Sequence, residues 1–189
     1  MVLGLVGKAG SGKSTVADEL ERCGAKRISL DKLGHCVLAQ SSKELIDIFG
    51  QISSESGEID RGKLGNLVFS DRSALQKLNA LIHPLIRSKA LQEIDIDYPF
   101  SVIDGALLHE IGLSDYCDRI IWLDCPDEEA VRRLVARGMK REKAIAILRS
   151  QSHLETLKDS CDAVISTTGS TEATFMKVRS VLFEWGIMV

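Results

Sequence analysis

The hydrophobic pattern of the chain alternates between short apolar runs and segments with helical periodicity. The apolar runs predict five buried strands, at residues 2–6, 26–30, 101–104, 119–124 and 162–165. Residues 14–22 and 171–185 follow the first and the last of these strands with the spacing of amphipathic helices. Because strands that alternate with helices form parallel sheets, the pattern predicts a three-layer α/β fold, with a five-stranded parallel sheet and helices on both faces.

The middle of the chain, residues 41–99, has helical periodicity and no convincing strand. Its apolar side chains form three helix faces, which consist of Leu45, Ile46, Ile48 and Phe49, of Leu64, Leu67, Val68 and Phe69, and of Leu75, Leu78, Leu81 and Ile82. Residues 51–62 contain Ser53, Ser54, Ser56 and Gly57 and predict a loop between helices. We interpret residues 41–99 as a helical insertion that binds either a substrate or a partner protein.

The composition is that of one globular domain. With 189 residues, of which 44% are hydrophobic, the chain can bury a full core. A formal net charge of -3 argues against a broad nucleic-acid-binding face. The apolar run at residues 120–123 is far shorter than the ~20 residues that span a bilayer, and the first strand begins at residue 2, where a secretory signal would lie. We expect a cytoplasmic protein that binds neither nucleic acid nor membranes.

The five cysteines, Cys23, Cys36, Cys117, Cys125 and Cys161, are scattered and never spaced C-x-x-C. This usage predicts reduced thiols rather than disulfides or a zinc site, and we expect the cysteines to be small hydrophobic residues of the core. Near the C-terminus, the apolar residues Val181, Leu182, Trp185 and Ile187 are expected to pack on the protein's own sheet. A monomer or a weak homo-oligomer is therefore expected.

A phosphate-binding motif lies at the junction of the first strand and the first helix. The residues Gly7-Lys8-Ala9-Gly10-Ser11-Gly12-Lys13-Ser14 fit the pattern G-x-x-x-x-G-K-[ST]. The glycines at positions 7, 10 and 12 allow a tight turn that points backbone N–H groups inward, and the helix N-terminus adds the positive end of its dipole. The motif predicts that residues 7–15 bind the phosphates of a nucleoside triphosphate.

Three side chains of this loop have predicted roles in binding the triphosphate. Lys13 is expected to reach the β- and γ-phosphates. The hydroxyl of Ser14 is expected to complete the coordination of a Mg²⁺ ion that bridges these phosphates. Thr15 supplies a second hydroxyl near the α-phosphate.

Two carboxylates end predicted strands at the edge where parallel sheets bind ligands. Asp31 follows the second strand, where it would either accept the proton of an attacking hydroxyl or cap the next helix. Beside a phosphate loop, we favour the catalytic role. Asp104 ends the third strand, where it would hold a Mg²⁺-bound water, orient Lys13 or act as a cap.

Two further features are informative only in this context. Pro84 is suited to the first position of a helix, so we expect His83 at an exposed junction between two helices, where a single histidine is usually structural. After the fourth strand, a helix is predicted to begin at Asp127, and a row of arginines follows, namely Arg132, Arg133, Arg137 and Arg141. A solvated charged face is the ordinary explanation for such a row.

Together these features resemble the dephospho-coenzyme A kinase family, which consists of P-loop kinases of the nucleoside-monophosphate-kinase type. The distinctive stretch is Leu78-Asn79-Ala80-Leu81-Ile82-His83-Pro84-Leu85-Ile86. Residues 104–110 resemble the family's Asp-x-Pro-Leu-Leu-Phe-Glu, since Asp104, Leu107, Leu108 and Glu110 match while Ala106 and His109 differ. The resemblance covers nearly the whole chain.

The resemblance implies that the γ-phosphoryl group of ATP is transferred to the ribose 3′-hydroxyl of dephospho-coenzyme A, with Mg²⁺ as cofactor. It implies Asp31 as the base. The cations that neutralise the transferred charge are then Lys13, Arg137 and Arg141, with Arg133 as a weaker candidate. Acceptor-binding residues are expected at Asp31, Arg61, His83, Asp104, Leu107 and Glu110. The implied division is a core at residues 1–40, 100–125 and 152–189, an acceptor-binding insertion at 41–99 and a lid at 126–151.

Four more positions depart from the family pattern. Lys8 replaces a usual Gly of the phosphate loop, and His35 replaces a usual Arg after Asp31. Thr167 and Thr168 stand in a turn where the family carries an Asn near the adenine. Two rival functions stay open on the sequence: a kinase of the same fold with another hydroxyl or nucleotide acceptor, and a nucleotide-dependent regulatory protein.

Overall fold

The computed structural model describes residues 1–54, 57–94 and 98–188, so Ser56 of the predicted loop lies outside the described residues. The chain divides into two compact units. The first consists of Met1–Ser29 and Ile94–Val189, and the second consists of Leu30–Glu93. The helical insertion was expected at residues 41–99, whereas the compact helical unit begins at Leu30.

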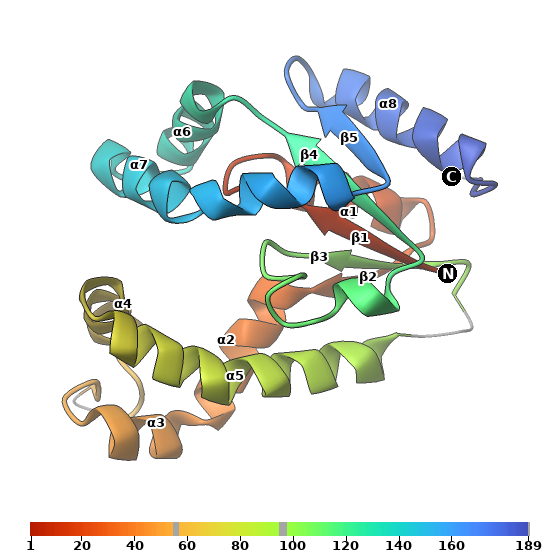
Figure 1. The fold of residues 1–189 in the computed structure, drawn as a ribbon. Coiled ribbons are helices and arrows are strands. Elements are labelled where there is room, and N and C mark those ends of the chain that lie inside the picture. Colours follow the sequence, from red (N-terminus) through yellow and green to blue (C-terminus); the bar gives the residue numbers. More distant parts are fainter. Residues whose placement is uncertain (55–56, 95–97, 189) are drawn as a thin grey trace. The chain divides into compact units, whose positions relative to one another are not determined.

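The first unit is built on a parallel sheet (Figure 1). Its strands are β1 (Val2–Val6), β2 (Lys26–Ser29), β3 (Ser101–Asp104), β4 (Arg119–Asp124) and β5 (Ala163–Ser166), in the order β2-β3-β1-β4-β5. Every neighbouring pair of strands is parallel. The predicted fold class is therefore confirmed, and all five strands lie within one residue of their predicted bounds.

Helices cover this sheet on both faces. They are α1 (Lys13–Arg22), α6 (Asp127–Ala136), α7 (Arg141–Ser150) and α8 (Thr171–Glu184), with the short 3₁₀ segments η1 (Ser114–Tyr116) and η2 (Ser152–Ser160). Helices α1 and α8 pack on one face, in a core formed mainly by Leu3, Leu5, Val16, Leu20, Ile121, Leu123, Val178 and Leu182. Val181, Trp185 and Ile187 pack against this core, as expected. The segment η2 crosses the opposite side of the sheet (Figure 1).

The second unit consists of α2 (Leu30–Gln40), α3 (Ser42–Phe49), α4 (Arg61–Ser70) and α5 (Arg72–Glu93). Helices α2 and α4 pack on α5, and α3 packs on α2. Inward-facing apolar side chains of this unit include Leu33, Val37, Leu45, Leu64, Ile82 and Ile86. Within its described residues, the β-structure is limited to an isolated bridge between Ser53 and Ile59.

The predicted helix junction at His83 is wrong. Pro84 lies inside α5, which runs without a break from Arg72 to Glu93. Proline removes one helical hydrogen bond, but the helix buries Ile82 before Pro84 and Ile86 and Ala90 after it, while Pro84 itself is exposed. The continuous buried face outweighs the lost bond, so His83 is half-buried in a helix interior rather than exposed at a helix start.

Two other burial predictions are partly wrong. Cys23 and Cys36 are exposed rather than part of the core. Cys23 caps the C-terminus of α1, and Cys36 lies at the edge of the buried face of α2 that Leu33 and Val37 form. In the predicted helix faces, Leu45, Leu64 and Ile82 are buried, whereas Ile48, Phe69 and Leu75 are exposed, because each helix packs along a narrower face than its apolar content suggests.

In the described part of the chain, no helix combines the length and the apolar character that crossing a membrane requires.

Candidate active site

The phosphate loop joins β1 to α1, as the motif predicts. Gly7, Gly10 and Gly12 have φ values of 143°, 76° and 94°, in the region that favours glycine. Two of these glycines are also confined by space. A Cβ atom on Gly7 would lie 2.5 Å from the carbonyl oxygen of Leu123, and one on Gly10 would lie 2.7 Å from that of Ala130. The loop thus packs tightly against β4 and α6, whereas there is free space beside Gly12, where α1 begins.

The loop has the groups that an oxygen-rich anion requires. The Nζ atom of Lys13 donates to the carbonyl oxygens of Gly7 at 2.8 Å and Lys8 at 3.0 Å, which holds the ammonium across the loop. The hydroxyl of Ser11 is buried, and within the described residues it has no hydrogen-bond partner. Since buried hydroxyls are normally paired, this unpaired group and the open side at Gly12 fit a phosphate.

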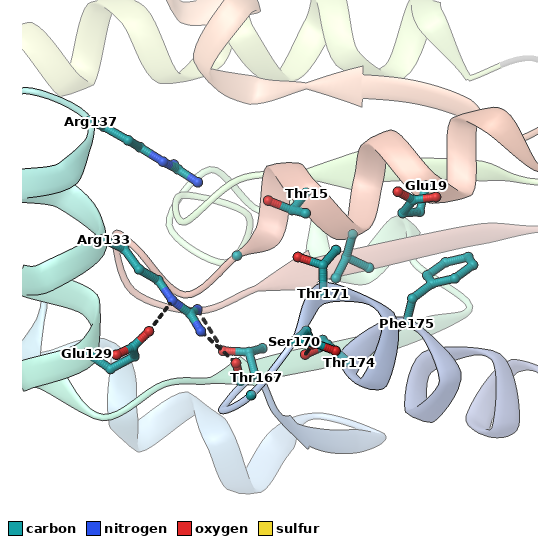
Figure 2. Close-up of a pocket in the computed structure, with 13 residues that line it drawn as sticks. Thr15, Glu19, Glu129, Arg133, Arg137, Thr167, Ser170, Thr171, Thr174 and Phe175 are labelled. Carbon is teal, nitrogen blue, oxygen red and sulfur yellow. Dashed lines mark hydrogen bonds and ion pairs between the residues drawn. The ribbon is translucent and has the colours of Figure 1, made fainter.

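A pocket of about 220 Å³ adjoins the loop (Figure 2). It is lined by the start of α1, one side of α6, and the turn and first residues of α8: Gly12, Thr15, Val16, Glu19, Glu129, Arg133, Arg137, Thr167, Gly169, Ser170, Thr171, Thr174 and Phe175. Pockets for drug-sized ligands measure ~300–1,000 Å³. This pocket therefore suits part of a nucleotide, with the phosphates on the adjoining loop.

Arg133 and Arg137 extend from α6 into this pocket (Figure 2). The guanidinium of Arg133 donates to the carbonyl oxygen of Thr167 at 2.7 Å, to its hydroxyl at 3.2 Å and to the carbonyl oxygen of Gly10 at 3.4 Å. It also pairs with Glu129 at 2.8 Å. Arg132 and Arg133 lower the pKa of Glu129, which keeps this partner ionised. Arg133 is thus the arginine that the folded chain fixes beside the loop.

The two other lid positions differ in their surroundings. Arg137 is exposed at the C-terminal end of α6. Arg141 is the exposed first residue of α7, and it borders a separate hollow with Pro126, Glu128 and Arg132. Arg137, but not Arg141, therefore lines the pocket beside the loop, although both were predicted to contact the phosphates.

Thr167 and Thr168 have clear structural partners. The hydroxyl of Thr167 is buried, accepts from Arg133 and donates to the carbonyl oxygen of Asp124 at 3.2 Å. The hydroxyl of Thr168 pairs with that of Ser166 at 2.7 Å. Thr167 thus ties the turn to Arg133 at the wall of the pocket.

At the end of β3, the carboxylate of Asp104 accepts from Arg27 Nη2 at 2.6 Å. Both side chains are buried, with exposed fractions of 5% and 9%, and Arg27 also pairs with Asp18. This ion pair was not predicted from the sequence. Arg27 is a charged residue inside a strand-like segment, which suggests that it has a charged partner, but that partner lies 77 positions away.

The next residues form a turn on the same edge. Leu107 is half-buried, and the exposed Glu110 lies 3.1 Å from Nε2 of His153 in η2. Burial lowers the pKa of His109, so its imidazole is neutral at physiological pH.

The remaining predicted residues belong to the second unit. Asp31 is exposed in the first turn of α2, and His35 is exposed one turn later. Arg61 is the exposed first residue of α4, directly after the N-cap Asp60, whose carboxylate accepts from the backbone N–H groups of Gly62 and Lys63. In the described residues, no group of three or more His, Cys, Asp or Glu side chains is arranged to hold a metal ion. At loops of this kind, Mg²⁺ takes a Ser or Thr hydroxyl, phosphate oxygens, water and at most one or two carboxylates, so its binding does not require such a group.

Comparison with known proteins decides the family. The profile of the dephospho-CoA kinases matches residues 1–173. The chain belongs to the dephospho-CoA kinase family. A relative from Carboxydothermus hydrogenoformans that is named dephospho-CoA kinase is 36% identical, over 97% of this chain and 94% of its own length.

Solved structures agree with this assignment. A structure from Thermus thermophilus has 33% identity and a TM-score of 0.85, over 97% of each chain. A dephospho-CoA kinase from Campylobacter jejuni has 28% identity and a TM-score of 0.72, over 97% of this chain and 96% of its own. The chain is therefore a P-loop kinase, a phosphotransferase that uses ATP as donor.

Proposed function

We propose that this kinase transfers the γ-phosphoryl group of ATP to the ribose 3′-hydroxyl of dephospho-coenzyme A, which gives coenzyme A and ADP. The observation that carries the proposal is the family match over residues 1–173, because it includes the phosphate loop, the helical second unit and the lid together. Free thiols at all five cysteines are typical of a reducing compartment, so we place the reaction in the cytoplasm.

On the donor side, the proposed phosphate-binding residues are those from Gly7 to Thr15. Lys13, already held across the loop by two carbonyl oxygens, would exchange these partners for the β- and γ-phosphates. When bound at Ser14, Mg²⁺ would supply further positive charge to the phosphate oxygens. Arg137 would enter from the lid, whereas Arg141 would need a lid movement to leave its separate hollow.

On the acceptor side, we propose that Asp31 accepts the proton of the 3′-hydroxyl. Its carboxylate is exposed at the start of α2, directly after β2, which leaves it accessible to a substrate. Arg61 and His83 are proposed to bind the acceptor in the second unit. Asp104, Leu107 and Glu110 are proposed for the edge of the sheet, where Asp104 would act through Arg27. Alignment of the attacking oxygen with the γ-phosphorus would supply much of the rate.

The test is ADP release with ATP and Mg²⁺, with and without dephospho-coenzyme A, for the native chain and Asp31→Asn. We expect the acceptor to stimulate ADP release, and coenzyme A to accumulate in step. Asp31→Asn should lower kcat by about 10²- to 10⁴-fold while ATP binding is kept. Asp47→Asn is the matched control, since Asp47 is an exposed acid of α3, and it should behave as native. A native chain that binds ATP and ignores this acceptor would overturn the proposal.

A further inference from the structure

Lys8 is a residue of the phosphate loop whose side chain is directed to the lid. Its Nζ atom donates to Asp127, the first residue of α6, and to Glu155 in η2 at 2.5 Å. Asp127 lies at the start of the predicted lid segment, residues 126–151, and Glu155 lies four residues after its end, so the two acids mark where the chain enters and leaves the lid. Only 8% of the Lys8 side chain is exposed, against about 60% for each acid. One buried ammonium therefore joins the start and the end of the lid.

The neighbouring residue strengthens the same connection. The backbone N–H of Ala9 donates to Oε1 of Gln151 at 2.7 Å, directly after α7 ends. The carbonyl oxygen of Lys8 accepts from Nζ of Lys13 at 3.0 Å. Lys8 is thus linked through its side chain to both ends of the lid and through its backbone to the lysine proposed to bind the transferred phosphate.

The charge of Lys8 is maintained by these contacts. Burial lowers the pKa of its ammonium, but the hydrogen bonds and charges of Asp127 and Glu155 outweigh burial and raise the pKa above its ordinary value. The ammonium is therefore protonated throughout the neutral range. The two ion pairs are available under all conditions in which the enzyme would work.

We propose that Lys8 is a positioning residue that holds both ends of the lid on the phosphate loop and so keeps Arg133 and Arg137 over the donor pocket. The consequence for catalysis rests on the proposed function, in which a closed lid favours transfer to the acceptor over transfer to water. The consequence for lid stability does not depend on the substrate.

The first experiment is hydrogen–deuterium exchange on the full chain without nucleotide, for Lys8→Met and Lys158→Met. Lys158 is the matched control because its ammonium pairs with Asp124 at 3.0 Å in the same charged region. Exchange in α6 and α7 should rise about three- to tenfold in Lys8→Met, the range expected for two partly exposed ion pairs. Exchange in α8 should not change in either variant. Equal lid exchange in Lys8→Met and native protein, or an equal rise in Lys158→Met, would overturn the proposal.

The second readout is the ratio of ADP to coenzyme A formed with saturating substrates. A loosened lid admits water, so the excess of ADP over coenzyme A should rise about three- to tenfold in Lys8→Met, whereas Lys158→Met should keep the native excess. A global loss of fold would lower both products without changing their ratio. If the native chain forms no coenzyme A, the proposed function fails, and the exchange experiment still decides the role of Lys8.

A double variant tests whether Lys8 acts through the two acids. Asp127→Asn with Glu155→Gln leaves the loop sequence intact and should reproduce the lid exchange of Lys8→Met. Adding Lys8→Met to this pair should produce little further change, because the same interactions are already lost. Fully additive effects would show that Lys8 does not act through these carboxylates. The double variant also serves if Lys8→Met does not fold.

Discussion

Gly10 shows how single residues of the phosphate loop are fixed by space as well as by backbone angle. Its φ of 76° is unfavourable for other residues, and the backbone of Ala130 in α6 occupies the place where a Cβ would lie. Gly24 has a similar φ of 93°, but nothing lies within 4 Å of its Cβ position. Replacing each glycine by alanine therefore separates two costs in free energy: the cost of the backbone angle, which both positions have, and the cost of the close contact with α6, which only Gly10 has.

We expect Gly24→Ala to lower the free energy of unfolding by about 1–2 kcal/mol, the cost of a left-handed conformation. Gly10→Ala should lower it by about 1–3 kcal/mol more, because α6 must move away from the loop. Urea denaturation of both variants measures the difference. If both variants lose the same free energy of unfolding, α6 can move away from the loop without loss of stability.

The cysteines permit a second prediction at this scale. Burial raises the pKa of Cys117 to about 12 and that of Cys161 to about 11, and it also raises the pKa of Cys125. Because the thiolate is the reactive form, these three thiols should react slowly at pH 8, whereas the exposed Cys23 and Cys36 should react fast.

Titration with a disulfide reagent at pH 8 should thus give two fast thiols in the native protein and five after unfolding in denaturant. In Cys23→Ser with Cys36→Ser, the fast phase should disappear. As pH rises toward 11, Cys161 should begin to react before Cys117. A third fast thiol at pH 8 would contradict the burial of Cys117, Cys125 and Cys161.

Ion-pair partners were harder to predict from the sequence than the residues of the phosphate-binding motif. The loop glycines and Lys13 could be predicted, because their spacing is a local property of the chain. The partners of Lys8 and Arg27 could not, because Lys8 meets Asp127 over 119 positions and Arg27 meets Asp104 over 77. A sequence pattern records which residues carry charge, but pairing over such distances depends on the complete fold.

At the scale of elements, Pro84 is placed where a helix normally excludes proline. Interior proline costs ~3 kcal/mol relative to alanine, although it also reduces the entropy of the unfolded chain by ~0.4–1 kcal/mol. Pro84 is exposed, so alanine at this position removes no packing. We expect Pro84→Ala to raise the free energy of unfolding by about 2–2.6 kcal/mol, the difference between these two terms.

The matched control is Pro126→Ala, which should have the opposite sign. Pro126 precedes α6 as its N-cap, where no helical hydrogen bond is lost, so its replacement changes mainly the unfolded chain and should cost about 0.4–1 kcal/mol. Thermal denaturation followed by circular dichroism measures both. A loss of stability in Pro84→Ala would mean that the proline shapes a bend on which α5 packing depends.

The contrast between local sequence patterns and tertiary packing explains which elements could be predicted from the sequence. Strands β1, β3 and β4 have their predicted bounds, since each contains a short apolar run. Helix α5 was predicted as two helices, because local rules treat proline as a boundary, whereas its buried face extends on both sides of Pro84. Local chemistry thus determines where apolar strands begin and end, but tertiary packing decides whether a helix continues.

At the scale of the whole molecule, the two units differ in what they contain. The first unit holds the sheet, the phosphate loop and helices α6 and α7, and the second holds α2 to α5 with Asp31, Arg61 and His83. Trp122 in β4 and Trp185 after α8 are the two tryptophans of the sequence, and both belong to the first unit. Tryptophan fluorescence therefore reports on the unit proposed to bind ATP, while circular dichroism reports on all helices.

This arrangement predicts how nucleotide changes the unfolding of the protein. ATP at about 100 times its Kd should stabilise the native state by about 2.7 kcal/mol. For a protein of this size, the melting temperature seen by tryptophan fluorescence should then rise by about 5–11 °C. Lys13→Met should remove most of this rise, because the ammonium across the loop is lost, whereas Lys158→Met should keep it. A rise of the same size in Lys13→Met would mean that ATP binds away from the loop.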